Sequence, residues 1–322
     1  MPKDMPENMP ASTRVRYLLI FISFYPALCV ATTYYLPSPG EHIVGEVQVI
    51  TAQENDTLRQ IARDYEIGYN ALIAANPGIT QKPLTKGKKI TIPSQYILPN
   101  TPYEGVVINL PEMRLYYYPP PQAGHKPVVS TYAIGIGKQG YSMPPGISKI
   151  TSKTLNPTWT VPKSILSEHT KNGVTHPKTI APGPNNPLGK HALRLGRTSY
   201  LIHGTNKPYS IGMRVSHGCI RMYPEDIEML FPVIPSGTVV RVIHQPLKSG
   251  WHGNALYVEA HSALQDPKKP RDTPDDTMSS FIATPDLEID DVTRTAIRQA
   301  SESNLGLPVR VYTPDPAARA RY

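Results

Sequence analysis

Hydrophobic and polar residues follow two different periods along this chain, and the change comes near residue 100. Within residues 42–94, Asp56 or Thr57 can cap a helix whose apolar residues keep helical spacing, at Leu58, Ile61, Ala62 and Tyr65. A second short helix over 72–75 ends at Asn76-Pro77-Gly78, and "KKITIP" is typical of a returning strand. The pattern predicts a small βααβ module.

From about Thr101 the pattern changes to short runs of valine, isoleucine and tyrosine that are broken by proline and glycine. "GVVINLPEMRLYYYP" predicts a hairpin with its turn at Pro111-Glu112, and further strands are expected at "VVSTYAIGIG", "HALRLG", "SYLIHGT" and "TVVRVIHQ". The expected fold class is therefore mainly β, with a β-sandwich or partly open barrel over residues 102–246.

One helix is expected inside this β region, and it begins just after the motif "SHGCIR". Pro224 suits the first helical turn, and the acidic residues Glu225 and Asp226 suit the positive end of the helix dipole. Ile227, Leu230 and Phe231 would lie on one face.

Residues 247–322 predict a small accessory region. "QDPKKPRDTPDDT" is typical of a linker, and an amphipathic helix follows, with Ile289, Val292, Ala296 and Ala300 as its predicted apolar positions. The helix is expected to end near Gly306, before "PVRVY". No ligand is assigned to this region, and we expect it to pack against the β domain.

Residues 1–31 predict a secretory signal peptide. Arg14 and Arg16 precede the apolar stretch "YLLIFISFYPALCVA", and the small residue Ala31 offers a cleavage site. An uncleaved membrane anchor is the alternative, but the stretch is shorter than the roughly 20 residues that a spanning helix needs, and it contains Pro26. The remaining chain is therefore expected to work outside the cytoplasm.

The charge balance favours an anionic polymer or surface as the partner. The 322-residue chain has 33 basic and 25 acidic residues, a net charge of +8, and loss of the signal segment lowers this charge only to +7. Nucleic acid is not expected, because the basic residues are scattered and no groove-reading motif accompanies them.

Cleavage after Ala31 would leave Cys219 as the single cysteine of the mature chain. An unpaired cysteine in an exported protein bonds to another chain or acts as a reactive thiol, and the alternative is a buried, inert side chain. Its neighbours Ser216, His217 and Gly218 would line an apolar pocket poorly, so we expect a reactive thiol.

A reactive cysteine attacks as the thiolate, so it needs a nearby base or positive charge. His203, in "LIHGTN", and the adjacent His217 are both candidate bases, and the residues alone do not rank them. Backbone amides at Gly218 and Cys219 would suit an oxyanion. Arg221 could grip a substrate carboxylate with two parallel hydrogen bonds, or it could be a solvated surface charge.

Two stretches resemble known families. Residues 42–94 resemble a LysM domain through "ENDTLRQIARDY", Leu72 to Asn76, and "L..G..ITIP". The segment 102–246 resembles the L,D-transpeptidase (YkuD) family, in its ErfK/YbiS branch, through "NPTWTVPKSI", "APGPNNPLGKHALRLG", "YLIHGTN" and "SIGMRVSHGCIRMYPEDIEMLF". The first resemblance implies binding to peptidoglycan, the second acyl transfer within it, and the two together a periplasmic location.

The resemblance also implies roles for individual residues. Cys219 would be the nucleophile and His203 the base, with the Gly204 carbonyl orienting the histidine. His217 and the amides near Gly218 would serve the oxyanion, while Arg221 and Ser216 would lie on the substrate side. Many family members have asparagine where this chain has Arg221.

The implied reaction cleaves a tetrapeptide stem between its third residue, usually diaminopimelate, and the terminal D-alanine. No cofactor is implied. The acceptor would be an amine of a second stem, giving a 3,3 crosslink, or the terminal lysine of an outer-membrane lipoprotein, whereas water would make the enzyme a carboxypeptidase.

Two interpretations from other classes compete with this one. A metal site could draw on His203, His217, Cys219 and His191, although structural zinc sites usually bring closely spaced cysteine pairs that are absent here. A non-catalytic, peptidoglycan-binding scaffold would use the LysM segment alone, but every signature position of the catalytic motif is filled.

Overall fold

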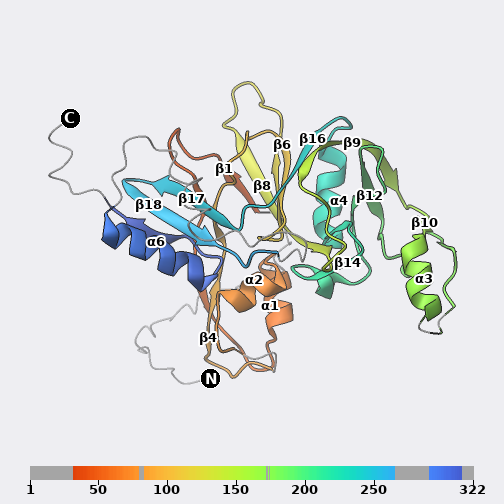
Figure 1. Cartoon of the computed structure of the whole chain (residues 1–322), viewed down its shortest axis with the longest axis horizontal. Helices are drawn as coiled ribbons and strands as arrows, with labels where there is room; N and C mark the ends of the chain where they lie inside the picture. Colours follow the sequence, from red (N-terminus) through yellow and green to blue (C-terminus); the bar gives the residue numbers. More distant parts are fainter. Residues whose placement is uncertain (1–31, 80–82, 172, 174, 265–289, 314–322) are drawn as a thin grey trace, which may run out of the picture.

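The computed structural model describes residues 32–79, 83–171, 173, 175–264 and 290–313. Figure 1 shows a central β structure, with the helices of the first module on one side of it and a helix-covered sheet from the end of the chain on another. Within the described ranges, no helix combines the length and the apolar character needed to cross a membrane. The predicted signal peptide lies outside these residues.

The first module has the predicted βααβ order. Its elements are β3 (Gln48–Thr51), α1 (Leu58–Asp64), α2 (Tyr69–Ala74) and β4 (Lys89–Ile92), and β3 pairs antiparallel with β4. Thr57 is the residue that caps α1, because its hydroxyl accepts a hydrogen bond from the Gln60 amide (3.2 Å). A second ribbon, β2 (Ile43–Gly45) with β5 (Gln95–Ile97), links the module to the rest of the chain.

The β domain is a ten-stranded sheet that closes on itself. Its strands follow the order β8-β15-β13-β12-β9-β16-β6-β7, and β7 pairs back with β8. These strands are β6 (Gly105–Asn109), β7 (Arg114–Tyr118), β8 (Val128–Gly137), β9 (Gly146–Leu155), β12 (His191–Leu195), β13 (Leu201–His203), β15 (Ile220–Met222) and β16 (Val239–Ile243). Of the two arrangements predicted, the structure has the barrel, and the mainly β fold class is confirmed.

Two further strands attach to β8, namely β1 (Thr32–Tyr35) and β14 (Arg214–Ser216). No strand was predicted in this segment, so β1 is found only in the structure. Its residues "TTYY" are largely exposed, and the pattern therefore carries no apolar alternation that would mark a strand. The ladder to β8 forms because backbone groups along that strand are available for pairing.

The predicted helix after the cysteine motif is α4 (Pro224–Val233), and its Ile227 and Leu230 enter the barrel core. Glu225 and Asp226 both lie in the first turn, as predicted. Asp226 is only 1% exposed, and burial raises the pKa of its carboxyl well above the usual range, which favours the neutral acid.

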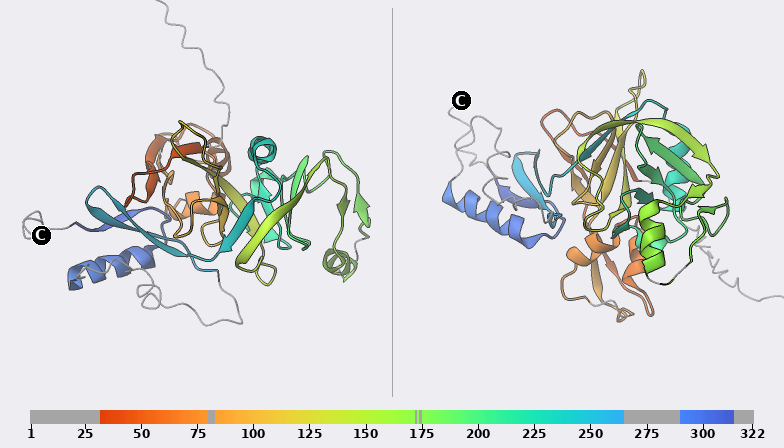
Figure 2. Two further views of the ribbon diagram at one scale, coloured as in Figure 1. Left: turned by 90° about the horizontal axis from the view of Figure 1, so that it is seen from above. Right: turned by 45° about the vertical axis from the view of Figure 1, so that its right-hand side comes forward.

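Between β9 and β12 the chain makes an excursion that contains α3 (Lys163–Lys171) and a short ribbon of β10 (Trp159–Thr160) with β11 (Thr179–Ile180). In the left view of Figure 2 this excursion lies at the opposite end of the molecule from α6 (Asp291–Ser303). A single turn of 3₁₀ helix, η1 (Pro208–Ser210), precedes β14.

The C-terminal region is a three-stranded sheet of β17 (Leu247–His252), β18 (Ala255–Ala260) and β19 (Val309–Tyr312), covered by α6. The predicted helix exists, but its predicted face is partly wrong: Val292 is 77% exposed, whereas Thr293 and Ile297 are buried. Asp290 caps the helix, and the face that then meets the sheet passes through 293, 297 and 300. The linker 265–277 and Ile289 lie outside the described residues.

A buried charge cluster attaches this C-terminal sheet to the barrel. The Lys248 ammonium lies 3.0 Å from a Glu112 oxygen and 2.9 Å from a Glu259 oxygen, and all three side chains are at most 2% exposed. Lys248 Nζ also donates to the Ile97 carbonyl (2.7 Å), and His261 Nε2 lies 2.6 Å from the same Glu259 oxygen that Lys248 contacts. We call these five residues the seam cluster.

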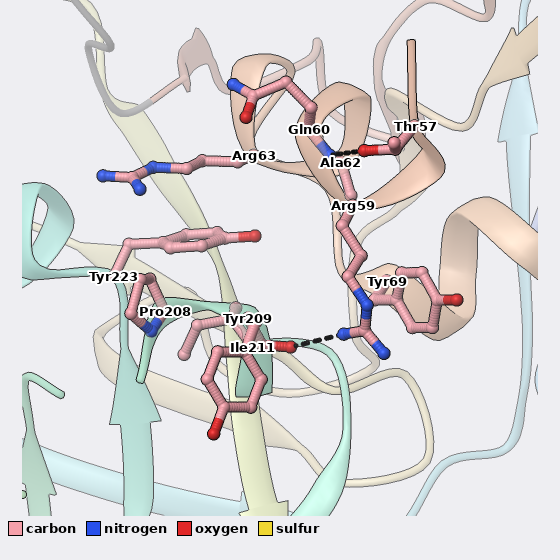
Figure 3. A pocket seen from close by; sticks show the side chains of 10 residues that line it. All are labelled: Thr57, Arg59, Gln60, Ala62, Arg63, Tyr69, Pro208, Tyr209, Ile211 and Tyr223. Carbon is pink, nitrogen blue, oxygen red and sulfur yellow. Dashed lines mark hydrogen bonds between the residues drawn. The ribbon is translucent and has the colours of Figure 1, made fainter. Parts of the chain in front are cut away.

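The βααβ module docks on the barrel through direct backbone contact. The α2 amide of Asn70 donates to the Gly212 carbonyl (3.2 Å), and a Cβ at Gly212 would stand 2.2 Å from the Tyr69 nitrogen. Gly212 also has φ +74°, so only glycine fits this contact. Beside it, a cavity of about 180 Å³ separates α1 from the η1 segment. Figure 3 shows Arg59 reaching across that cavity to donate to the Tyr209 carbonyl (3.1 Å).

Candidate active site

The predicted thiol stands at a sharp turn between β14 and β15. Gly218 has φ +111°, and a Cβ there would lie 2.9 Å from both the Tyr141 carbonyl and the Tyr200 ring, so the turn requires glycine. The Ser216 hydroxyl braces the turn by donating to the Cys219 carbonyl (2.6 Å) and accepting from the Gly218 amide (3.1 Å). Cys219 is thereby held, half-buried, just before β15.

His203, Arg221 and Cys219 come together through strand register. β13 and β15 run parallel, with His203 paired to Arg221. Cys219 directly precedes β15, and the charge of Arg221 acts on both the thiol and the imidazole. The barrel thus brings together the thiol, one of the two candidate bases and the predicted carboxylate-binding arginine.

His203 is buried at 3% exposure, and its environment keeps the imidazole neutral. Its Nδ1 lies 2.6 Å from the Gly204 carbonyl, which fixes the proton on that nitrogen and leaves Nε2 as the acceptor. Burial, reinforced by the nearby charge of Arg221, lowers the pKa of His203 to about 4. A neutral imidazole at physiological pH is able to accept a proton.

Cys219 is held as the neutral thiol. Burial raises the pKa of the thiol above its ordinary value, and the opposing effects of the Leu201 amide and of Arg221 do not outweigh it. The thiol donates weakly to the Ser199 carbonyl (3.8 Å). Of the two routes to a thiolate considered above, this electrostatic balance favours removal of the proton by a base.

Arg221 retains a donor that is not used by any group in the part of the chain that the structure describes. Its Nη1 donates to the Ser210 hydroxyl (3.3 Å), but Nε is buried and has no hydrogen-bond partner among the described residues. A buried guanidinium N–H without a partner costs free energy, so the arrangement suits an incoming carboxylate or carbonyl oxygen. Arg221 is half-buried rather than a solvated surface charge.

His217 faces a different set of groups. Its Nε2 lies 2.9 Å from a Glu168 oxygen, and its ring packs edge-on against Tyr141 (4.9 Å between centroids). Glu168 also accepts from the Lys138 ammonium (3.0 and 3.1 Å). The two histidines that the sequence left unranked therefore differ: the buried His203 bonds to backbone, and the more exposed His217 bonds to a carboxylate.

Sequence reasoning missed Glu168, Lys138 and Ser210. Glu168 is 49 residues from His217 and stands outside the quoted motifs, whereas Ser210 begins the motif that contains Cys219, 11 residues before Arg221. His191, considered above as a metal ligand, packs its ring on Phe231 (4.7 Å between centroids). Within the described ranges, the one set of three side chains with ligand-like spacing is Glu112, Glu259 and His261, where Lys248 supplies the positive charge.

Comparison with known proteins assigns two families to the chain. The model of the L,D-transpeptidase catalytic domain (YkuD) matches residues 104–242, and that of the LysM domain matches residues 50–93.

Whole-length similarity extends to several curated bacterial proteins. The probable L,D-transpeptidase YcfS of Escherichia coli K12 is 37% identical over 94% of this chain and 97% of its own length. The probable L,D-transpeptidase YbiS of the same strain is 38% identical over 87% of this chain and 92% of its own length. The probable L,D-transpeptidase ErfK/SrfK, also from that strain, is 40% identical over 73% and 76%.

Proposed function

Because the chain belongs to the L,D-transpeptidase (YkuD) family, we propose that Cys219 is its nucleophile and His203 its general base. The protein is a cysteine-dependent L,D-transpeptidase that acts on peptidoglycan, and it carries a LysM domain that binds the same polymer. The observation that supports the residue assignment is the pairing of His203 with Arg221 across β13 and β15, two residues from Cys219.

In the acylation step, Cys219 Sγ attacks the carbonyl carbon of the bond between the third stem residue and D-alanine. His203 Nε2 takes the thiol proton, and the protonated imidazole then gives it to the leaving amine. The C–N bond breaks, D-alanine leaves, and a thioester forms. An acceptor amine attacks the thioester, an amide bond replaces the C–S bond, and the thiol is restored.

The tetrahedral intermediate carries a negative oxygen that needs fixed donors. We assign this role to the backbone amides at Gly218 and Cys219 and to His217. The open Nε donor of Arg221 suits the stem carboxylate, and Ser216 keeps the turn in shape by bonding to Gly218 and Cys219. Gly204 orients His203 through its carbonyl.

The proposal also covers the acyl acceptor and the compartment in which the enzyme works. A second stem would give a 3,3 crosslink, and a lysine-ended lipoprotein would give an anchored protein. An enzyme that acts on peptidoglycan works outside the cytoplasm, and we propose the periplasm as its location, reached with the signal peptide of residues 1–31.

The test is mass analysis of products from purified tetrapeptide muropeptides, with and without a lysine-ended acceptor peptide. We expect free D-alanine together with amide-linked dimers or lysine-linked stems. Tripeptides alone would identify a hydrolase, and an absence of turnover would favour the scaffold alternative. Alkylation of Cys219 should abolish turnover, whereas turnover that survives alkylation would exclude Cys219 as the nucleophile.

A further inference from the structure

Glu168, on helix α3 in the excursion between β9 and β12, contacts the cysteine motif through its carboxylate. Glu168 Oε2 lies 2.9 Å from His217 Nε2, and its two oxygens lie 3.0 and 3.1 Å from Lys138 Nζ. Lys138 follows the end of β8, and His217 stands in the turn before Cys219. Three segments that are distant in sequence therefore meet at Glu168.

The segments around this contact are fixed to one another by backbone bonds. The Lys138 amide donates to the Ser216 carbonyl (2.9 Å), and the Tyr141 amide donates to the Lys138 carbonyl (2.9 Å). Tyr141 in turn packs edge-on against the His217 ring, and the Lys138 ammonium lies 4.9 Å from the Tyr141 ring centroid. The His217 ring is thus held from two sides, by an aromatic edge and by a carboxylate.

We propose that Glu168 is a positioning residue for transpeptidation, which acts by fixing the orientation and tautomer of His217; this inference rests on the function proposed above. A carboxylate accepts but does not donate, so the nitrogen that faces Glu168 must carry a proton. The Nε2–H form is selected, and Nδ1 of the neutral ring is left as a hydrogen-bond acceptor.

The consequence concerns how the oxyanion is stabilised. Fixing the His217 ring also fixes the turn whose Gly218 and Cys219 amides we assign to the oxyanion, and donors that are already oriented need no reorganisation when charge develops. A carboxylate that orients a functional imidazole is a recurrent arrangement, and loss of such a partner costs about 10–100-fold where the histidine is a metal ligand. The groups that face Glu168 are the His217 imidazole and the Lys138 ammonium, so its carboxylate is held by partners from two different segments.

The experiment compares Glu168→Ala, Glu168→Gln and Glu168→Asp in the full chain, with tetrapeptide muropeptides as the substrate. We expect Glu168→Ala to lower kcat by about 10–100-fold and to leave KM unchanged. Glu168→Gln, which can still accept a hydrogen bond, should retain more activity than Glu168→Ala. In ¹⁵N spectra the wild type should show His217 in the Nε2–H form, and Glu168→Ala should show a mixture of tautomers.

Glu302→Ala, at the exposed end of α6, serves as the matched control and should keep the wild-type kcat. Wild-type kcat or an unchanged tautomer in Glu168→Ala would overturn the inference, as would a fall in kcat matched by loss of folded protein. Cys219→Ser is measured in parallel. If that variant is active, the proposed function fails; if it is inactive while Glu168→Ala is fully active, only the role of Glu168 fails.

Discussion

Two polar groups of this protein contrast in how their charges are paired, namely the seam cluster around Lys248 and the site around Cys219. In the seam cluster the ammonium of Lys248 meets two carboxylates at 3.0 and 2.9 Å, so each of these buried charges has a partner of opposite sign. At the Cys219 site Arg221 lies beside His203, and its Nε donor has no partner among the described residues. Burial of charge is common to both, but only the Cys219 site leaves a donor open.

The pKa values of the two groups move for different reasons. Burial alone would raise the pKa of Glu259, yet Lys248 and His261 hold it below its usual range, so the cluster keeps its charges. At the Cys219 site, burial and the charge of Arg221 both disfavour the charged form of His203. A perturbed pKa therefore identifies a functional site only when the partners that cause it leave room for a ligand.

The largest effect on activity is expected from replacing the thiol of Cys219. Cys219→Ser should lower kcat/KM by on the order of 10⁴-fold, or about 5 kcal/mol of transition-state stabilisation, because a hydroxyl is far less acidic than a thiol. Thermal unfolding should be unchanged, since the thiol makes only a weak contact with Ser199. Activity near the wild-type level would exclude the nucleophile assignment.

Breaking the seam cluster should have the opposite outcome, a large loss of stability with activity retained. Lys248→Met leaves two buried carboxylates without their cation, which should cost about 3–5 kcal/mol in the free energy of unfolding. The midpoint of urea unfolding measures this change, and Lys86→Met, on the exposed surface, is the control. A loss below about 1 kcal/mol would mean that the cluster relaxes or admits water.

Acidification should lower the stability of the folded protein through His203. Its pKa is about 4 in the folded protein and about 6.5 in the unfolded chain, so the unfolded state binds more protons between these values. Stability is therefore lost as the pH falls from about 6.5 to 4, by roughly 3 kcal/mol in total. To isolate the contribution of His203, the free energy of unfolding is compared between wild type and His203→Gln over this pH range. A difference that does not change with pH would contradict the burial of a neutral imidazole.

The smallest effect is expected where an ion pair is exposed. Arg63 of α1 contacts Glu225 of α4 at 2.5 Å, but their side chains are 45% and 29% exposed. Arg63→Gln should cost about 0.2–1 kcal/mol, and salt should reduce the difference further. Urea unfolding in low and in high salt tests this. A cost as large as that of Lys248→Met would remove the distinction between exposed and buried pairs.

The sequence predicted local features well because local chemistry determines them. Thr57 caps α1, Pro224 begins α4, and the turn at Gly218 places Cys219 next to β15. The mainly β class also followed from the strand pattern. Closure of the barrel by β7 and β8 could not be predicted, because it depends on register between whole strands rather than on any single motif.

The missed features all depend on long-range contacts. Lys248 and Glu259 belong to residue types that are rarely buried, so their composition argued against the seam cluster. Glu168 carries no local signal, since its partners His217 and Lys138 are 49 and 30 residues away. Val292 was assigned to the wrong helix face because the apolar pattern of α6 is sparse, and tertiary packing selected Thr293 and Ile297 instead.

The glycine contact between α2 and the segment before β14 changes how the two functions of the molecule are linked. Gly212 leaves no space for a side chain or for a flexible spacer between the LysM module and the residues that lead to Cys219. The orientation of the two units is therefore settled during folding. When the LysM module binds peptidoglycan, the catalytic domain is therefore held in one orientation to the polymer, without the additional loss of chain entropy that a flexible tether would suffer.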